Sequence, residues 1–573
     1  MNFSILRRVS RLAAIGAILF GSASCVYINE ELGQNLMPTD QKWDVFTPED
    51  AVLEGIQLQV ADSLSAYNSS RFTFGSVNDS RFGINDKSTS FTLVPILDSL
   101  DFGKNTRIRQ FHFSAALDTI SICASGQERI LQNVYVSELK TPLDTLALYT
   151  GTFMSPENRA KYLDTENLIT SGIPVYNGGD SLSFDFSEEF AESIVRRFDK
   201  VKLDSIDLYT KKFPGIHIET DAPIGQGGRI NMFELNLETS KENYIIGNFA
   251  ELKFTADYDD RMDVDTSFIF YFGPGDLMKD GSTTIPTQFA FNTSSHQSIQ
   301  EEFAKAWNEG NKEKMYVEGG SGMKPVVRAR EIKDIVTAML IEHGITDFKE
   351  VVINKASIIL PYEMPSDFTE LDRFPSILSP TVKLRSENGG YITYAGLTDS
   401  SVESEDQGDI NRSTGMYSPD ISHHVQKILN LDENDKDFEK SIENYDIWLL
   451  IMHDEKVKQS STSNSNTDLM NSLLYSSYYN NMMYGGYGGY GYGYGYPYGY
   501  GGYGGYGYGY NNYYNYMMMA SMAGSYSTGE TTSRGLDKDR YYNGMLNGPG
   551  YGTELEQKPR LKITFSAPKT AEK

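Results

Sequence analysis

The chain has 573 residues, a formal net charge of -26 at pH 7 and only two cysteines. So acidic a protein repels phosphate backbones, which excludes nucleic acid as a partner, and the length allows two or three domains with cores of their own. We therefore expect a protein whose partners are other proteins or neutral glycans.

The first 24 residues have the pattern of a bacterial lipoprotein signal peptide. The pattern consists of basic Arg7, Arg8 and Arg11, the apolar run 12–20, and the small residues 21–24 directly before Cys25. The run is too short to span a bilayer. We interpret residues 1–24 as a signal peptide and Cys25 as the lipidation site. An ordinary secretory signal cleaved nearby is the alternative.

Lipidation of Cys25 would anchor the chain to a membrane without a transmembrane helix, since each buried methylene contributes about 0.8 kcal/mol. Residues 25–50 are polar and contain Gly33, Pro38 and Pro48, which predicts a lipidated tether. With Cys25 carrying lipid, Cys123 has no disulfide partner. Its apolar neighbours predict a buried core residue.

From residue 51 onward the pattern is typical of antiparallel strands. Apolar and polar side chains alternate in 250–255, 233–237 and 561–565, whereas 268–272 is apolar throughout and predicts a buried strand. Turn clusters such as 225–228 separate these runs, as in an antiparallel sandwich. Because helices do not alternate regularly with strands, a parallel sheet is not expected.

Three amphipathic helices interrupt the strands. Their apolar stripes are Phe190, Ile194 and Phe198 after a capping Ser187, the stretch 332–340 before Gly344, and Phe303 with Trp307. Nothing polar recurs within the stripes, so we expect these helices to face the core.

A polar stretch at 238–248 predicts the boundary between two halves, a first β-sandwich domain at 51–238 and a second at 248–573. Both halves contain strands, a helix and further strands, which points to a duplicated sandwich. The expected fold class is mainly β, with two antiparallel, jelly-roll-like β-sandwich halves, a few amphipathic helices and a long disordered loop.

Residues 484–510 contain only tyrosine, glycine and one proline, Pro497. Glycine has a large ordering entropy and no aliphatic residue offsets it, so we predict a disordered insertion at 459–555, lying as a loop between the strands at 445–452 and 560–566. The insertion is either a neutral spacer or an adhesive segment. In the second case its rings stack on sugars, and the candidates are Tyr487, Tyr490, Tyr494, Tyr498 and Tyr503.

Catalytic motifs are incomplete. The segment 319–323 has methionine where a nucleophile elbow requires its closing glycine, and Lys324 precedes a proline where a phosphate loop requires serine or threonine. We interpret the segment as an exposed turn. No catalytic constellation is found, and we expect neither an enzyme nor a cofactor.

Clustered carboxylates offer a weak calcium site. Asp257, Asp259 and Asp263 crowd a hairpin between two strands, and their oxygens are ligands that calcium accepts. A solvated acidic loop is the simpler interpretation, and on that interpretation the protein binds no metal.

Four segments resemble the domain of unknown function 4270 family, which comprises uncharacterised lipoproteins of Bacteroidota. The segments are Glu-Glu-Leu-Gly at 30–33, Phe-Gly-Ser-Val-Asn-Asp-Ser-Arg-Phe-Gly at 74–83, Asn-Lys-Ala-Ser-Ile-Ile-Leu-Pro at 354–361 and Leu-Lys-Ile-Thr at 561–564. The resemblance covers most of the mature chain and implies an outer-membrane setting, at the outer face, with a β-sandwich body. It implies no reaction, and the tyrosine-glycine tract is not part of the family pattern.

Together these features predict a non-enzymatic, lipid-anchored outer-membrane protein at the cell surface. We expect it to dock on a membrane protein partner, as an accessory subunit of a transport or barrel-assembly machine. The alternative is a glycan-binding or adhesive surface lipoprotein, and a glycosidase comes third.

Overall fold

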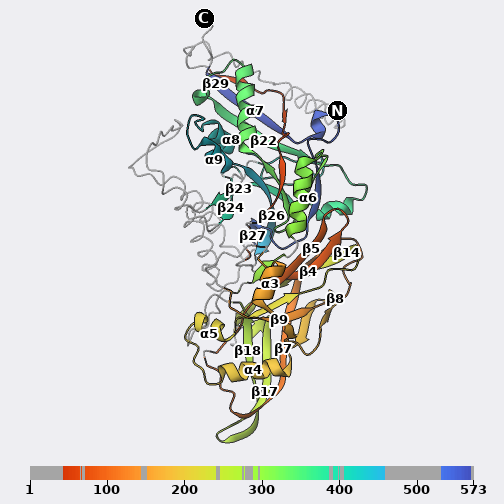
Figure 1. Cartoon of the computed structure of the whole chain (residues 1–573), viewed down its shortest axis with the longest axis vertical. Helices are drawn as coiled ribbons and strands as arrows, with labels where there is room; N and C mark the ends of the chain where they lie inside the picture. The colour runs from red at the N-terminus through yellow and green to blue at the C-terminus, as the bar shows by residue number, and fades with distance from the viewer. Residues whose placement is uncertain are drawn as a thin grey trace, which may run out of the picture.

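The computed structural model describes residues 43–568, apart from gaps at 63, 65, 67–70, 98, 144–150, 152, 240–244, 274–276, 278–287, 289, 295–296, 386–391, 398, 400–405 and 458–530. Figure 1 shows an elongated molecule with two lobes along its long axis, which we call the upper and lower lobes as they lie in that view. The fold is mainly β, as the sequence predicts, and the ladders between described strands are all antiparallel.

The lower lobe is built on a twelve-stranded sheet. Its strands are β4 (Arg71–Asp79), β5 (Gly83–Phe91), β6 (Leu93–Pro95), β7 (Lys104–Ile122), β9 (Tyr135–Leu139), β10 (Leu163–Leu168), β12 (Ser181–Asp185), β13 (Ile216–Glu219), β14 (Gly227–Glu234), β17 (Phe249–Tyr258), β18 (Arg261–Phe272) and β19 (Phe291–Thr293). Two ribbons flank it, β8 (Gln132–Asn133) with β11 (Val175–Tyr176), and β15 (Leu237–Thr239) with β16 (Ile245–Gly247). Its helices are α3 (Pro156–Tyr162), α4 (Glu188–Phe198) and α5 (Ile206–Lys212).

Phenylalanine rings fill the core of the lower lobe. Phe72 and Phe233 stack with centroids 4.7 Å apart, and Phe113 stacks on Phe184 at the same separation. The predicted helix over this core is confirmed as α4. The Ser187 hydroxyl accepts a hydrogen bond from the Phe190 amide at 3.2 Å, which caps the helix and turns its apolar stripe inward.

The upper lobe combines two larger sheets, a ribbon and four helices around one core. The five-stranded sheet contains β1 (Trp43–Phe46), β2 (Ala51–Val52), β22 (Val352–Pro361), β25 (Met416–Tyr417) and β29 (Arg560–Pro568). The six-stranded sheet contains β3 (Gln57–Val60), β21 (Met323–Val327), β23 (Ile377–Arg385), β24 (Ile392–Gly396), β26 (Ile447–Val457) and β27 (Thr531–Leu536). The ribbon pairs β20 (Lys314–Glu318) with β28 (Asn543–Asn547).

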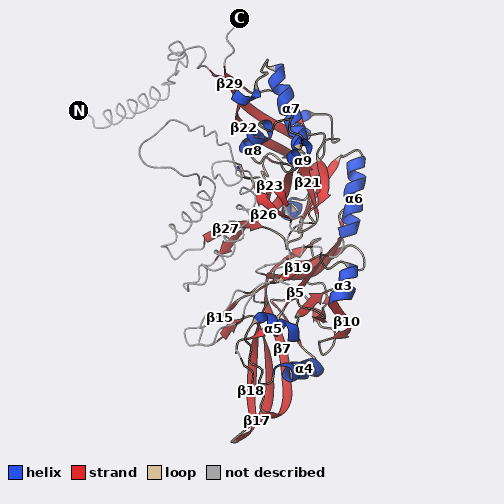
Figure 2. Cartoon of the chain, turned by 60° about the vertical axis from the view of Figure 1, so that its left-hand side comes forward, coloured by secondary structure: helices blue, strands red, loops and turns tan. Residues whose placement is uncertain are grey.

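The helices of the upper lobe are α6 (Gln297–Glu309), α7 (Ala329–Glu342), α8 (Ser422–Leu429) and α9 (Phe438–Glu443), with 3₁₀ turns η2 (Phe348–Glu350), η3 (Phe368–Arg373) and η5 (Leu555–Gln557). The two remaining predicted helices are confirmed as α6 and α7. In Figure 2, α6, α3 and α4 follow one side of the molecule. Lys333 of α7 caps the C-terminal end of α8. Its Nζ donates hydrogen bonds to the carbonyl oxygens of Ile428, Leu429 and Leu431 at 2.8–3.3 Å.

The boundary between the lobes differs from the predicted one at 238–248. The strands β17 and β18 follow that stretch, yet β17 pairs with β7 in the lower lobe. At the other end, β1 and β2 pair with β29, and β3 pairs with β21, so residues 43–60 belong to the upper lobe. The tether predicted at 25–50 is therefore too long at its C-terminal end, because its last residues include the sheet strand β1. Pairing between strands far apart in the chain leaves no trace in local patterning, which is why the sequence misplaces the boundary.

The predicted disordered insertion at 459–555 is too long at its C-terminal end. Residues 531–536 form β27, which pairs directly with β26, and 543–547 form β28. The part at 458–530, including Tyr487, Tyr490, Tyr494, Tyr498 and Tyr503, lies outside the described residues. The strand after the tract is therefore β27, adjacent to β26, and not the strand at 560–566 that the sequence indicates.

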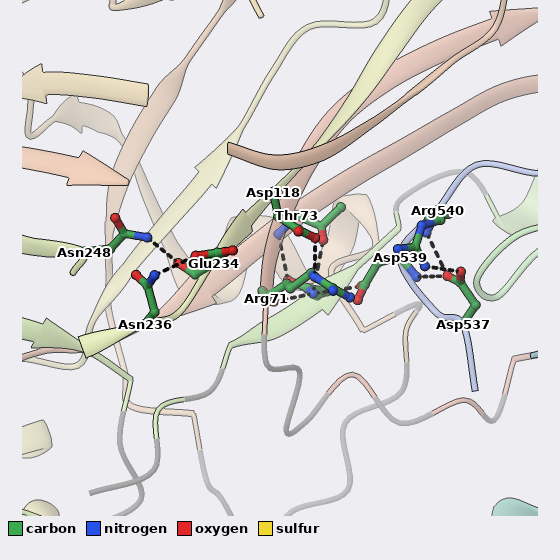
Figure 3. A network of polar contacts seen from close by, with 10 residues as sticks. Arg71, Thr73, Asp118, Glu234, Asn236, Asn248, Asp537, Asp539 and Arg540 are labelled. Carbon is green, nitrogen blue, oxygen red and sulfur yellow. Dashed lines mark hydrogen bonds and ion pairs between the residues drawn. The ribbon is translucent and has the colours of Figure 1, made fainter. Parts of the chain in front are cut away.

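A buried polar junction joins the lobes. Lys87 of β5, with 4% of its side chain exposed, donates to the carbonyl oxygen of Lys538 at 3.4 Å. Asn292 of β19 donates to Asp539 at 2.8 Å. Figure 3 shows Asp537, Asp539 and Arg540 on one segment beside Arg71 and Thr73 of the lower lobe. Burial lowers the pKa of Lys87, while nearby Asp539, Asp537 and Glu318 oppose that shift.

The turn at 319–323 lies within this junction, which corrects the predicted exposed turn. Its flanking residues Glu318 and Lys324 are 0% and 1% exposed. The Lys324 Nζ donates to the carbonyl oxygens of Glu318, Gly320 and Gly322, so all three of its donors have acceptors. Gly320 has φ +56°, and a Cβ there would lie 2.1 Å from the Lys87 Nζ, so the turn requires glycine. Burial raises the pKa of Glu318 and lowers that of Lys324.

Candidate functional site

The β8–β11 ribbon carries an exposed aliphatic patch. Strand β8 lies at the side of the lower lobe (Figure 1). The patch consists of Leu131, Ile173 and Val175, whose side chains are 72%, 49% and 55% exposed. We call it the β8–β11 patch. Aliphatic side chains grouped in this way mark interaction surfaces more often than single exposed ones do.

The strand register explains why the three side chains share one face. Val175 pairs with Asn133, and the amide of Val134 donates to the carbonyl of Pro174 at 2.8 Å, so the ladder continues beyond β8. Side chains alternate along each strand, and the intervening Val134 and Tyr176 are buried in the core of the lower lobe. The patch is therefore the outer face of a ribbon whose inner face is fixed by packing.

A hydrogen-bonded polar rim borders the patch. The Tyr135 hydroxyl donates to Asp221 at 2.6 Å, and the Asn133 amide donates to the same carboxylate at 3.1 Å. The hydrogen bond to Asp221 raises the pKa of Tyr135. Apolar side chains with a satisfied polar border are the usual composition of a protein-binding surface.

Nothing in the patch is a nucleophile or an acid–base group, so its chemistry is non-covalent contact. Elsewhere, Ser90, His217 and Glu219 have the residue types of a hydrolase triad, with Ser90 Oγ 2.7 Å from His217 Nδ1 and His217 Nε2 3.3 Å from Glu219. The two imidazole nitrogens are exchanged relative to such a triad, in which the serine contacts Nε2 and the carboxylate Nδ1. Sequence reasoning missed this set because Ser90 lies on β5, far in the chain from His217 and Glu219 on β13. Ser90 and His217 are each only 1% exposed, so no substrate reaches them, and they act as a polar contact between β5 and β13.

The weak calcium candidates lie around the β17–β18 turn and engage other groups. Asp257 accepts hydrogen bonds from the Asn105 side chain at 2.8 Å and from the Asp263 amide at 2.9 Å, and Asp263 forms an ion pair with Arg107. Asp259 is exposed at the turn. In the part of the chain that the structure describes, no group of three His, Cys, Asp or Glu residues is placed to hold a metal ion.

The other predicted site residues separate into two groups. Cys123 is a buried core residue, as predicted, and it packs with Val77, Ile230 and Tyr541. Burial and the neighbouring Asp79 raise the pKa of its thiol to about 11. Cys25 lies outside the described residues, as do the five tyrosines of the tract.

Sequence reasoning also missed the β8–β11 patch. The two strands contribute only two residues each and carry no alternation long enough to recognise. That Leu131, Ile173 and Val175 lie on one face of the ribbon is visible only in three dimensions.

Comparison with protein-family models, with curated proteins and with solved structures gives no match for this chain. Its similarity to the domain of unknown function 4270 family therefore stays a prediction from the four segments given above. Among the residues that the structure describes, no helix is both long enough and apolar enough to cross a bilayer.

Proposed function

We propose that the protein is a non-enzymatic lipoprotein of the outer membrane, displayed at the cell surface, that docks on a membrane protein partner through the β8–β11 patch. Cys25 carries the lipid, and the partner is a transport or barrel-assembly machine of which this chain is an accessory subunit. The observation that carries the proposal is the exposure of Leu131, Ile173 and Val175 on a face fixed by the fold.

The position of the patch supports this proposal. The tether reaches the described chain at Trp43, where β1 pairs with β29 in the upper lobe, whereas the patch lies on the lower lobe (Figure 1). A body attached through one lobe leaves the patch on the other lobe accessible to a partner.

Site-specific photo-crosslinking in intact cells tests the docking. A photoreactive phenylalanine analogue at Val175 is expected to give one crosslinked partner, and the same analogue at Leu208 is the control. Leu208 lies on α5, is 54% exposed and is not part of the patch. Crosslinks of equal yield at both positions, or none at Val175, contradict the proposal.

Charge substitution gives the matching affinity test. The double substitution Leu131→Asp with Val175→Asp is expected to lower copurification of the crosslinked partner at least tenfold. Binding of the partner would remove water from both carboxylates, and the cost of this desolvation weakens the complex. Leu208→Asp should leave copurification unchanged. Retention of the protein on a polysaccharide column, lost on deletion of 475–526, would instead favour the glycan-binding function.

A further inference from the structure

The outer face of the five-stranded sheet carries a second exposed surface, at the end of the molecule where the tether joins. Trp43 and Val45 of β1 are 45% and 65% exposed, and Val352 of β22 is 37% exposed. The chain has three tryptophans, and the other two, Trp307 and Trp448, are buried at 9% and 5% exposure. Trp43 is therefore unlike the others in presenting its ring to solvent.

The register places these side chains on one face. Val45 and Val352 both pair with Ser566 of β29, so they lie on either side of it, and Trp43 pairs with Pro568. The opposite face packs inward, because Phe46 stacks on Phe565 with centroids 5.4 Å apart and both rings contact His343 at the end of α7. The exposed surface is thus the side of the sheet that α7 does not cover.

The charge of this face is opposite to that of the chain. Its side chains, by alternation and by the Thr47–Thr564 and Ser566–Asn354 hydrogen bonds, are Trp43, Val45, Thr47, Lys562, Thr564, Ser566, Pro568, Val352, Asn354 and Lys355. Two are lysines, and the same alternation adds Arg560, which is ion-paired with Asp50 at 2.9 Å. Among the described residues, basic side chains therefore outnumber carboxylates on this side of the sheet, although the whole protein has a net charge of -26. We call this surface the end face.

This composition matches the interface of a lipid bilayer. Tryptophan is enriched at the level of the lipid headgroups, where its ring is partly apolar and its indole N–H is hydrated. Valine side chains add apolar contact, and lysines near an anionic membrane surface contribute electrostatic attraction. An acidic face would be repelled by the same surface.

The length of the tether is compatible with such a placement. Residues 26–42 separate Cys25 from Trp43, so even a fully extended tether spans no more than about 60 Å. A lipid on Cys25 therefore keeps the end face close to the leaflet that holds it, and raises its effective concentration there.

We infer that the end face binds the headgroup region of the lipid leaflet that holds the anchor, with Trp43 as its interfacial residue. The inference rests on the lipid anchor of the proposed function and adds an orientation to it. The upper lobe lies on the membrane through β1, β29 and β22, and the lower lobe with the β8–β11 patch extends away from it.

Fluorescence quenching by brominated lipid tests the inference. The full-length lipidated protein is reconstituted into vesicles of phosphatidylethanolamine and phosphatidylglycerol, with and without brominated phosphatidylcholine. The contribution of Trp43 is the difference in tryptophan fluorescence between the wild type and Trp43→Phe. We expect the brominated lipid to lower this contribution more than twofold. Val45→Glu with Val352→Glu is expected to abolish that quenching while the protein stays bound to the vesicles.

The matched control moves the reporter to the covered side of the sheet. Trp43→Phe with Ile341→Trp places an exposed indole on α7, where Ile341 is 56% exposed, and its fluorescence should not be quenched. Vesicle-bound protein whose Trp43 is not quenched, or is quenched no more than the indole at 341, overturns the inference. A protein that does not float with the vesicles contradicts the lipid anchor itself, and this placement with it.

Discussion

At the scale of single residues, the protein repeatedly surrounds a buried cation with carbonyl oxygens. Lys324 donates to three carbonyls in the junction, Lys333 to three at the end of α8, and Arg229, fully buried, to the carbonyls of Glu128 and Ile130. Carbonyl oxygens satisfy the N–H donors of the cation without the strict geometry that a buried ion pair with a carboxylate requires. Burial lowers the pKa of Arg229 to about 10, so the side chain still keeps its charge near neutral pH.

His424 of α8 makes the stability of the protein depend on pH. It is 5% exposed, lies 2.8 Å from the Tyr445 carbonyl through Nε2, and burial lowers its pKa to about 4. The unfolded chain binds the proton at about pH 6.5, so the stabilisation is complete above that pH and falls by about 3 kcal/mol as the pH drops to 4. His424→Gln should flatten this part of the profile in urea unfolding, whereas exposed His423→Gln should not. Equal acid sensitivity of the wild type and His424→Gln would contradict the assignment.

At the scale of elements, the β26–β27 pairing predicts that the tyrosine-glycine tract can be removed without loss of the fold. Val457 and Thr531 are register partners, so a short Asn-Gly turn spans the gap left by deleting 458–530. Each halving of a loop recovers about 0.6 kcal/mol of closure entropy, so the shortened protein should be as stable as the wild type or more stable by a few kcal/mol. Thermal unfolding measures this, and a lower Tm after deletion would show that the tract contributes contacts to the folded body.

The elements that the sequence predicted are those whose signal is local. Ser187 and the stripe after it identify α4, and the apolar run at 268–272 identifies the end of β18. The lobe boundary and the strand β27 were missed because each depends on a partner far away in the chain. The same limit hides the β8–β11 patch, whereas Cys25 rests on a contiguous motif and could be proposed from sequence alone.

At the scale of the whole molecule, the junction couples two lobes that have separate cores. The β4–β5 turn contributes Phe82 to the upper core, where its ring lies 5.1 Å from that of Tyr316, and Asp79 accepts a hydrogen bond from Asn543 at 3.2 Å. Together with the contacts of Lys87 and Asn292, these interactions connect strands of one lobe to loops of the other. Coupled lobes are expected to unfold in one cooperative transition.

Substitutions in the junction should split the single unfolding transition into two, one for each lobe. Lys87→Met with Asp539→Asn removes charged groups from both sides of the junction, and differential scanning calorimetry is expected to show two transitions in place of one. Lys253→Met is the control, because Lys253 forms an exposed ion pair with Glu251 at 3.1 Å on β17 and its loss costs less than about 1 kcal/mol. A single transition in the junction variant would mean that apolar contacts such as Phe82 suffice for coupling.

The orientation of the lobes and the accessibility of the patch both depend on the lipid at Cys25, because they follow from where the chain is attached. The most direct measurement is membrane fractionation of cells that express Cys25→Ala beside the wild type. We expect the wild type in the membrane pellet and the mature variant in the soluble fraction. A Cys25→Ala protein that stays in the pellet as completely as the wild type would contradict lipid anchoring at Cys25.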